Sequence, residues 1–219
     1  MTDGSTLGED FGRAFITVLH ETLSGAAPAL GDLDRRAGDG DFGDNVRVAM
    51  KNASRNIAET NPSTYHEWVQ AMSMAWLGVG GTSGPLNGMF FRELSKASAD
   101  ESAPSLEQFA EALAAGQATV QRYGQAEVGD KTMIDALAPA VEALRQGGSV
   151  TEALDRAAEA ARTAAQGTAD VVARRGRASY VGDVSKGVMD PGAAAMALVI
   201  AAANAAAAGE TTVETDWIG

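Results

Sequence analysis

Three aspartates lie close together early in the sequence, and glycines separate them. They are Asp34, Asp39 and Asp41, in the stretch Asp-Arg-Arg-Ala-Gly-Asp-Gly-Asp-Phe-Gly over residues 34–43. Two carboxylates about 4 Å apart repel each other by roughly 4 kcal/mol at an effective dielectric constant of about 20, and a divalent cation between them removes that cost. Oxygen ligands without His or Cys favour Mg²⁺ or Ca²⁺ over zinc. The pattern therefore predicts a magnesium or calcium site, and a solvated acidic turn before a helix is the alternative.

Known motifs that overlap this stretch lack the context that they require. Residues 38–43 fit the dinucleotide fingerprint G-x-G-x-x-G, but no strand precedes them. An EF-hand loop that starts at Asp39 has Gly43 at its fifth position and Met50 at its twelfth, so it cannot coordinate calcium. The triplet Asp-Phe-Gly at 41–43 has no protein-kinase catalytic loop beside it. These three interpretations are excluded.

A glycine-rich loop with two hydroxyl side chains precedes a further expected helix. Residues 80–84 are Gly-Gly-Thr-Ser-Gly, so Thr82 and Ser83 stand just before Pro85. Bare amides at a helix N-terminus suit phosphate oxygens, and hydroxyl groups add further donors. This loop is a candidate anion site, and a turn packed tightly between two helices is the alternative.

Two later loops complete the set of candidate contacts. Residues 124–132 resemble a P-loop, but Asp130 separates the glycine from the lysine and no parallel sheet is available. Residues 176–192 join a basic run to a helix start at Asp190-Pro191. Arg177 in this stretch is a candidate phosphate partner, and a surface salt bridge is the alternative.

The charge balance limits what the protein can bind. With 29 acidic and 17 basic side chains the formal charge is −12, which disfavours nucleic acid and repels any anionic ligand unless cations stand between. The absence of cysteine excludes thiolate metal sites. His20 and His66 fall within expected helices, so a covalent nucleophile has no support. Phosphoryl transfer fits better, because it needs mainly positioning and cations.

Helical spacing dominates the elements that must position these loops. Apolar residues recur at i, i+3 and i+4, which predicts eight helices at about 10–24, 43–60, 64–77, 85–98, 105–123, 132–146, 150–173 and 191–208. Thr64-x-x-Glu67, Ser105-x-x-Gln108 and Ser149-x-x-Glu152 are capping boxes, and Asp190-Pro191 is a fourth start signal. We expect an all-α fold with a single domain over residues 1–219, arranged as an antiparallel bundle or barrel.

Neither a secretory signal nor a membrane span is expected. The N-terminus carries acids where a signal peptide has bases. The apolar stretch at 193–208 is short, rich in Ala and interrupted by Asn204, whereas a span needs about 20 apolar residues. We therefore expect a cytoplasmic protein without a membrane partner.

Taken in order, the four loops resemble the nucleotide-binding L subunit of bacterial dihydroxyacetone kinases. The matching stretches are residues 33–43, residues 80–86 with Gly88 and Phe90-Phe91, residues 129–133, and residues 176–180 through 190–192. Within this family the resemblance implies an eight-helix antiparallel barrel, with ADP or ATP at one end and two Mg²⁺ ions held by Asp34, Asp39 and Asp41. It also implies a set of nucleotide-binding residues: Phe42, Gly43, Asp44, Asn45, Thr82, Ser83, Gly124, Met133, Arg177, Asp190 and Pro191.

The resemblance implies partners as well. A K-type subunit holds dihydroxyacetone on its own histidine, and in the phosphotransferase-system branch an M-type phosphocarrier subunit rephosphorylates the resident ADP. The alternatives are a subunit that uses free ATP for another ketose such as erythrulose, a non-catalytic nucleotide sensor, and the related domain of acyl-phosphate kinases. Three departures stand out: Phe42 where the family commonly has His, Asn87 for a usual aromatic, and Val188-Met189 for a His-containing pair.

Overall fold

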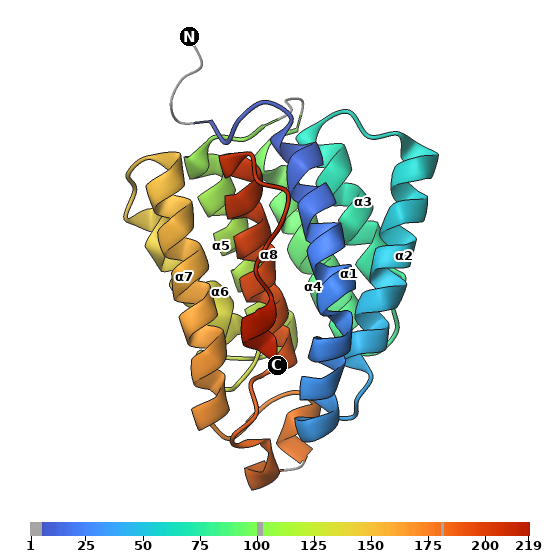
Figure 1. Ribbon diagram of the computed structural model, residues 1–219, viewed down its shortest axis with the longest axis vertical. Coiled ribbons are helices and arrows are strands. Elements are labelled where there is room, and N and C mark those ends of the chain that lie inside the picture. The colour runs from blue at the N-terminus through green and yellow to red at the C-terminus, as the bar shows by residue number, and fades with distance from the viewer. Residues whose placement is uncertain (1–5, 100–102, 181) are drawn as a thin grey trace.

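The computed structural model describes residues 6–99, 103–180 and 182–219 (Figure 1). Across these residues the chain forms eight α-helices and no β-strand apart from an isolated bridge between Thr6 and Ser105. The helices are α1 (Phe11–Ala37), α2 (Phe42–Thr60), α3 (Tyr65–Leu77), α4 (Ser83–Leu94), α5 (Leu106–Gly124), α6 (Met133–Arg145), α7 (Val150–Gly167) and α8 (Pro191–Ala208).

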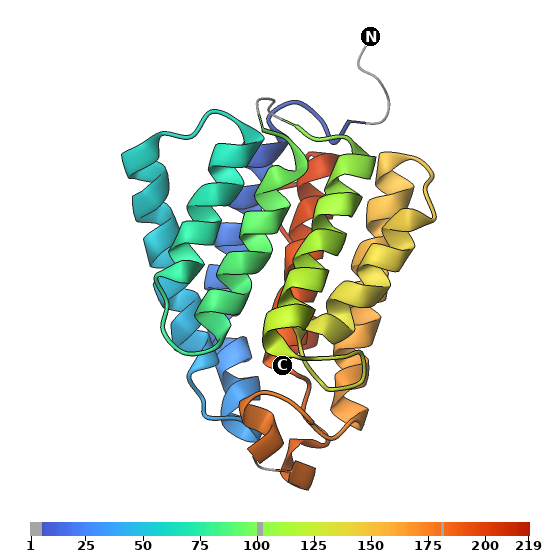
Figure 2. The ribbon, with the colours of Figure 1, turned by 180° about the vertical axis from the view of Figure 1, so that it is seen from behind.

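The helices form a closed antiparallel barrel, as predicted. Each helix packs against the next one in the chain, and α8 returns to pack against α1. Figure 1 shows α8 between α7 and α1, and Figure 2 shows α3 to α6 on the opposite side. Because neighbours run antiparallel, the connections α1–α2, α3–α4, α5–α6 and α7–α8 all lie at one end of the barrel. We call this end the pocket end.

The helix starts confirm the sequence signals. The capping boxes at Thr64, Ser105 and Ser149 form, and Asp190 accepts a hydrogen bond from the amide of Ala193 at the start of α8. The structure adds a capping box that the prediction missed, between Thr132 and Asp135 at the start of α6. The capping-box pattern did not predict it because Asp135 stands at the third helical position, where the pattern has Glu or Gln.

The first helix is much longer than the predicted 10–24. Gly25 and Pro28, which both destabilise a helix interior, follow the predicted end, but α1 continues to Ala37. Its buried apolar residues continue past the proline through Leu30 and Leu33, and their burial outweighs the local cost. As a result Asp34 lies on the last turn of a helix and not in a loop.

Two other helices end earlier than predicted. The helix expected to reach 98 ends at Leu94 and continues as the 3₁₀ turn Ser95–Ala97. The one expected to reach 173 ends at Gly167 and continues as Thr168–Asp170. Tighter turns at helix ends are common, because they satisfy the last carbonyls with closer partners.

Helix α8 is buried along most of its length. It is long and apolar enough to pass a test for a membrane span by length and composition, but 67% of that stretch is buried inside the barrel. Its many alanines leave room for α7, α1 and α6 to pack closely around it. Burial by neighbouring helices accounts for the apolar composition.

The crossing of α1 and α2 depends on two glycines. A Cβ atom placed on Gly43 would lie 2.6 Å from the carbonyl oxygen of Ala27 and 2.7 Å from the Cα of Gly31. The backbones therefore approach more closely than any other residue would permit, and this contact fixes the aspartate loop between the two helices.

We predict that Gly43→Ala destabilises the fold by about 1–3 kcal/mol, because the added methyl group meets backbone atoms that cannot move aside. Gly25→Ala on α1 is the matched control, since a Cβ there has nothing within 4 Å and should stabilise by about 0.5–1 kcal/mol. Urea unfolding followed by circular dichroism measures both. Equal stabilities for the two variants would contradict the close approach of α1 and α2.

Candidate functional site

A pocket opens at the pocket end of the barrel, and all four connections at this end contribute to its lining. The last turn of α1, the α1–α2 connection and the start of α2 give it a polar side, with Asp34, Asp39, Asp41 and Asn45. Helices α4 to α6 give it a mostly apolar side. The apolar lining residues there are Leu86, Val120, Ala126 and Met133. The pocket therefore presents charged groups and an apolar surface to the same ligand.

The aspartate loop is held in place by its own hydrogen bonds. Asp34 is only 7% exposed, and its Oδ2 accepts a hydrogen bond from the amide of Phe42 at 2.9 Å. Gly40 has a φ of +83°, which lets the chain turn between Asp39 and Asp41. Burial raises the pKa of Asp34, and the nearby charge of Asp39 raises it further. The loop therefore concentrates negative charge that a cation would relieve.

The donor atoms fit magnesium with help from a ligand. Among the residues that the structure describes, no three His, Cys, Asp or Glu side chains come close enough to hold a metal ion alone. Mg²⁺ is commonly held by one or two carboxylates, with phosphate oxygens and water as the other ligands. In this structure Asp39 instead pairs with Arg177, whose Nε lies 3.1 Å from Oδ2.

The start of α4 offers free amides to the pocket. Thr82 is the N-cap residue, but its side chain makes no capping hydrogen bond. Asn45 of α2 donates to the hydroxyl of Ser83 at 3.2 Å and so links the two helix starts. Backbone N–H groups at an uncapped helix start attract anions. The predicted anion site thus lines the same pocket as the aspartates.

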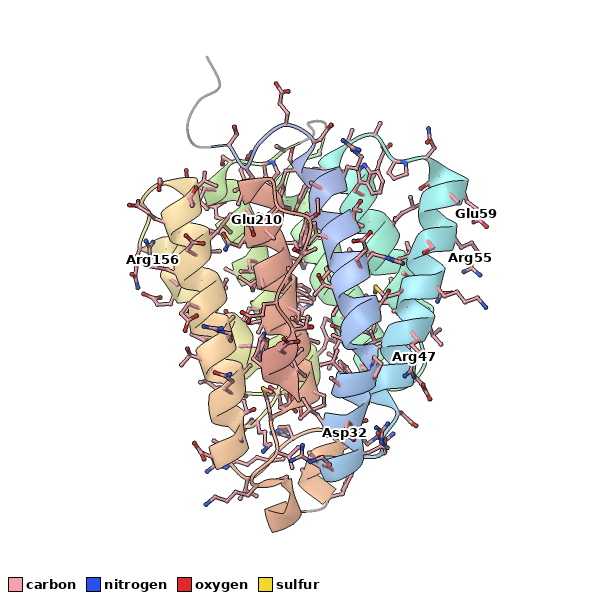
Figure 3. The ribbon with its side chains drawn as sticks, in the orientation of Figure 1. Asp32, Arg47, Arg55, Glu59, Arg156 and Glu210 are labelled. Atoms are coloured by element: carbon pink, nitrogen blue, oxygen red, sulfur yellow. The ribbon has the colours of Figure 1, made fainter. Side chains whose placement is uncertain are left out.

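Two residues that the resemblance assigns to the nucleotide do not line the pocket. Gly43 faces Gly31 at the helix crossing described above. The side chain of Asp44 is 78% exposed and pairs with Arg47, which projects outward from α2 (Figure 3). Of the other predicted residues, the three aspartates and Phe42, Asn45, Thr82, Ser83, Gly124, Met133, Arg177, Asp190 and Pro191 all line it.

The departures from the family pattern fall in or beside the pocket. Phe42, Asn87 and Met189 line it. Asn87 is 3% exposed and donates to the carbonyl of Ser83, while its own oxygen has no partner. The histidines lie elsewhere: His20 contacts the carbonyl of Met50, and His66 that of Ser95, so neither serves the site.

Asp190 carries the most perturbed carboxyl group of the site. Burial raises its pKa to about 7, the charge of Asp135 adds to this, and the hydrogen bond from the amide of Ala193 opposes it. Sequence reasoning missed the residue beside it, Lys131, whose charge also opposes the shift. Lys131 is buried, and only its glycine-rich surroundings pointed to it.

The raised pKa of Asp190 predicts a change of stability with pH. Between about pH 4 and pH 7 the folded protein keeps a proton that the unfolded chain loses, so this contribution is complete below about pH 4 and is lost as the pH rises to 7. Relative to Asp190→Asn, which keeps a capping oxygen, the wild type should lose about 2 kcal/mol over this range, since the pocket partly solvates the group. Urea unfolding of both proteins at several pH values measures it, and parallel curves would contradict the shift.

Comparisons with known proteins agree on one family. The model of the DAK2 domain matches residues 36–205. The chain is 34% identical over 195 residues to the ADP-binding subunit DhaL of PEP-dependent dihydroxyacetone kinase 1 from Listeria innocua, covering 89% of this chain and 94% of the relative. It is 36% identical over 184 residues to the corresponding DhaL subunit of Escherichia coli, covering 82% of this chain and 88% of the relative.

The fold is also found in a solved kinase. The crystal structure of the dihydroxyacetone kinase of C. freundii superposes with a TM-score of 0.68 at 28% identity, over 90% of this chain and 34% of that one. The same kinase in complex with AMP-PNP and Mg²⁺ gives a TM-score of 0.64 at 29% identity, over 87% of this chain and 32% of that one. These relatives are kinases or kinase subunits. Because the family model and the DhaL subunits match most of its length, this chain belongs to the DAK2 domain family.

Proposed function

We propose that the chain is the nucleotide-binding subunit of a dihydroxyacetone-type kinase and holds ADP or ATP with magnesium in the pocket. The observation that carries this is the pocket itself, which combines the aspartate loop, the uncapped start of α4, Arg177 and an apolar wall. The DhaL relatives are named as ADP-binding subunits, and the C. freundii kinase was crystallised with AMP-PNP and Mg²⁺.

The phosphates would lie on the polar side of the pocket. Asp34, Asp39 and Asp41 would hold two Mg²⁺ ions that also bind phosphate oxygens, which completes a coordination that the carboxylates alone do not provide. Arg177 would exchange Asp39 for a phosphate, since a guanidinium group binds both kinds of oxygen. The amides at Thr82 and Ser83 would bind a further phosphate oxygen.

The base and sugar would lie against the apolar side. Gly124 at the end of α5 has no side chain, and a Cβ atom there would lie 3.6 Å from Leu86. The resulting slot is bordered by Val120 and Met133. A flat aromatic base can fill such a slot without meeting charged groups.

Catalysis would depend on position and charge, without a covalent enzyme intermediate. Bound magnesium supplies the positive charge that neutralises the transferred phosphoryl group. The chain's own part is to hold the aspartates on the last turn of α1 and in the tight loop before α2, and to aim Arg177 and the α4 amides at the phosphates. Preorganised groups of this kind stabilise the transition state without reorganising.

The substrate would come from a second protein, the K-type subunit, that docks at the pocket end. The large apolar side chains that are exposed in the described residues lie near this end: Val48, Met74, Leu77, Tyr123, Val128 and Tyr180. Exposed apolar residues that gather around a site are typical of a protein interface. An M-type phosphocarrier in the cytoplasm would rephosphorylate the bound ADP, as the words "PEP-dependent" in the relatives' names suggest.

We predict that Asp39→Asn and Asp41→Asn weaken magnesium-dependent ADP binding roughly 100-fold, because each removes a charged ligand. Asp32→Asn is the matched control: Asp32 lies on α1 near the same end (Figure 3), pairs with Arg35 and does not line the pocket. Titration calorimetry measures affinity, and circular dichroism checks that the helices are retained. Wild-type affinity in either pocket variant would refute the metal assignment.

We predict that ADP co-purifies with the protein and resists exchange with free ATP, as expected of a subunit rephosphorylated in place. Reconstitution with a K-type subunit then tests the donor and the ketose. Relatives named L-erythrulose 1-kinase and L-erythrulose kinase, at 36% and 33% identity, make erythrulose the second substrate to try. Transfer from ATP alone would indicate the free-ATP alternative, and no transfer from ATP or a phosphorylated M-type protein would indicate a nucleotide sensor.

A further inference from the structure

Lys131 is a buried cation at the wall of the pocket, and none of the carboxylates whose side chains the structure describes is bonded to it. Its side chain is 1% exposed, and its backbone has a φ of +65°, which is unusual for a residue other than glycine. Burial of an ammonium group is unfavourable unless its donors are satisfied. The buried ammonium group and the positive φ of Lys131 therefore both cost free energy of folding, which other interactions must offset.

The ammonium group of Lys131 is bonded to three backbone carbonyls. Its Nζ donates to the oxygen of Val171 at 3.0 Å, of Ser185 at 2.6 Å and of Val188 at 2.7 Å. Burial lowers the pKa of Lys131, while the charges of Asp190 and Asp170 raise it and so favour the charged form.

These three bonds use all the donors of the ammonium group, which has three. Lys131 therefore has none left for a phosphate oxygen, even though it lines the pocket. It differs in this respect from the lysine of a P-loop, which contacts the phosphates directly. Its role must be exerted through the chain that it holds.

The carbonyls belong to two stretches that form one wall of the pocket. The first stretch, residues 171–180, carries Arg177, and the second, residues 185–190, carries Met189 and Asp190. Figures 1 and 2 show this part of the chain across the pocket end, between the ends of α1 and α7. Lys131 joins both stretches to the α5–α6 connection.

The other contacts that hold residues 171–180 are weaker than the hydrogen bond from Lys131. The ion pair between Arg177 and Asp39 has partners that are 60% and 41% exposed, and pairs with such exposure contribute little. Arg175 and Asp130 are 3.8 Å apart, also with an exposed arginine. Among the described residues, the other bonds from this stretch to its surroundings are those from the amides of Val171 to the carbonyl of Thr168, of Arg174 to the carbonyl of Asp130, and of Ala173 to the hydroxyl of Ser185. The buried, charged donor is the strongest of these contacts.

We propose that Lys131 is a positioning residue of the nucleotide site: by holding both stretches of the wall, its ammonium group determines how slowly the nucleotide is released. The inference rests on the proposed function. Arg177 can exchange Asp39 for a phosphate only if its backbone stays in place, and Lys131 supplies a support that does not change with the ligand.

The test is the rate of ADP release from Lys131→Met, which keeps a side chain of similar length and leaves three carbonyls without a donor. We expect release to be roughly 10- to 100-fold faster, measured by stopped-flow chase of a fluorescent ADP analogue. Hydrogen exchange should rise in residues 171–180 and 185–190 and not in α6. Lys186→Met is the control, because it removes the same charge from an exposed position next to Ser185 and should release ADP at the wild-type rate.

A double-mutant cycle separates positioning from a general structural role. Arg177→Ala should speed release strongly in the wild type and much less in Lys131→Met, since Arg177 is already displaced there. Lys131→Gly, which suits the positive φ, should behave like Lys131→Met. Wild-type release from either variant, or an Arg177→Ala effect that is unchanged by Lys131→Met, would overturn the proposal. So would loss of the whole fold in both variants. Failure of the wild type to bind ADP would instead refute the proposed function.

Discussion

The constraint on which the site depends is the supply of positive charge to an acidic pocket in an acidic protein. The chain has a formal charge of −12, and two of its carboxyl groups, Asp34 and Asp190, lie in the pocket, where burial raises the pKa of both. A nucleotide brings further negative charge. The repulsion between these carboxylates and the phosphates is tolerated only where cations or oriented amides face the phosphates. Arg177 and the start of α4 line the pocket, and bound magnesium would supply the remaining positive charge.

The antiparallel barrel is what brings these groups together. Connections that are far apart in sequence meet at one end because every second connection of an antiparallel ring lies on the same side. The helices that begin at this end, α2, α4, α6 and α8, contribute lining residues from their first turns, where free amides and the positive end of the helix dipole are found. Asp34 comes from the last turn of α1, Asp39 and Asp41 come from the loop that follows, and all three line the same pocket as these helix starts.

Much of this could be predicted, and the exceptions have physical reasons. The capping boxes predicted helix starts, and the four loops predicted residues that line one pocket. Both are local signals, which a sequence shows directly. The predicted end of α1 at residue 24 was wrong. Burial of Leu30 and Leu33 outweighs the low helix propensity of Gly25 and Pro28, so the helix continues. The resemblance assigns Gly43 to the nucleotide, and the structure places it at the helix crossing, outside the residues that line the pocket. From sequence alone a glycine near a backbone and a glycine near a phosphate look the same.

Lys131 shows most clearly what sequence could not reveal. Its three acceptors lie 40, 54 and 57 residues away, and each is a backbone carbonyl that any residue would provide. No residue type at those positions could therefore indicate the contact. Two cations of the pocket wall therefore differ. All three donors of Lys131 are bonded to backbone carbonyls, whereas Arg177 is exposed and pairs with Asp39, which would bind a metal ion instead. In the proposed site the two cations would therefore have different parts: Lys131 would hold the backbone of the wall, and Arg177 would bind the phosphate.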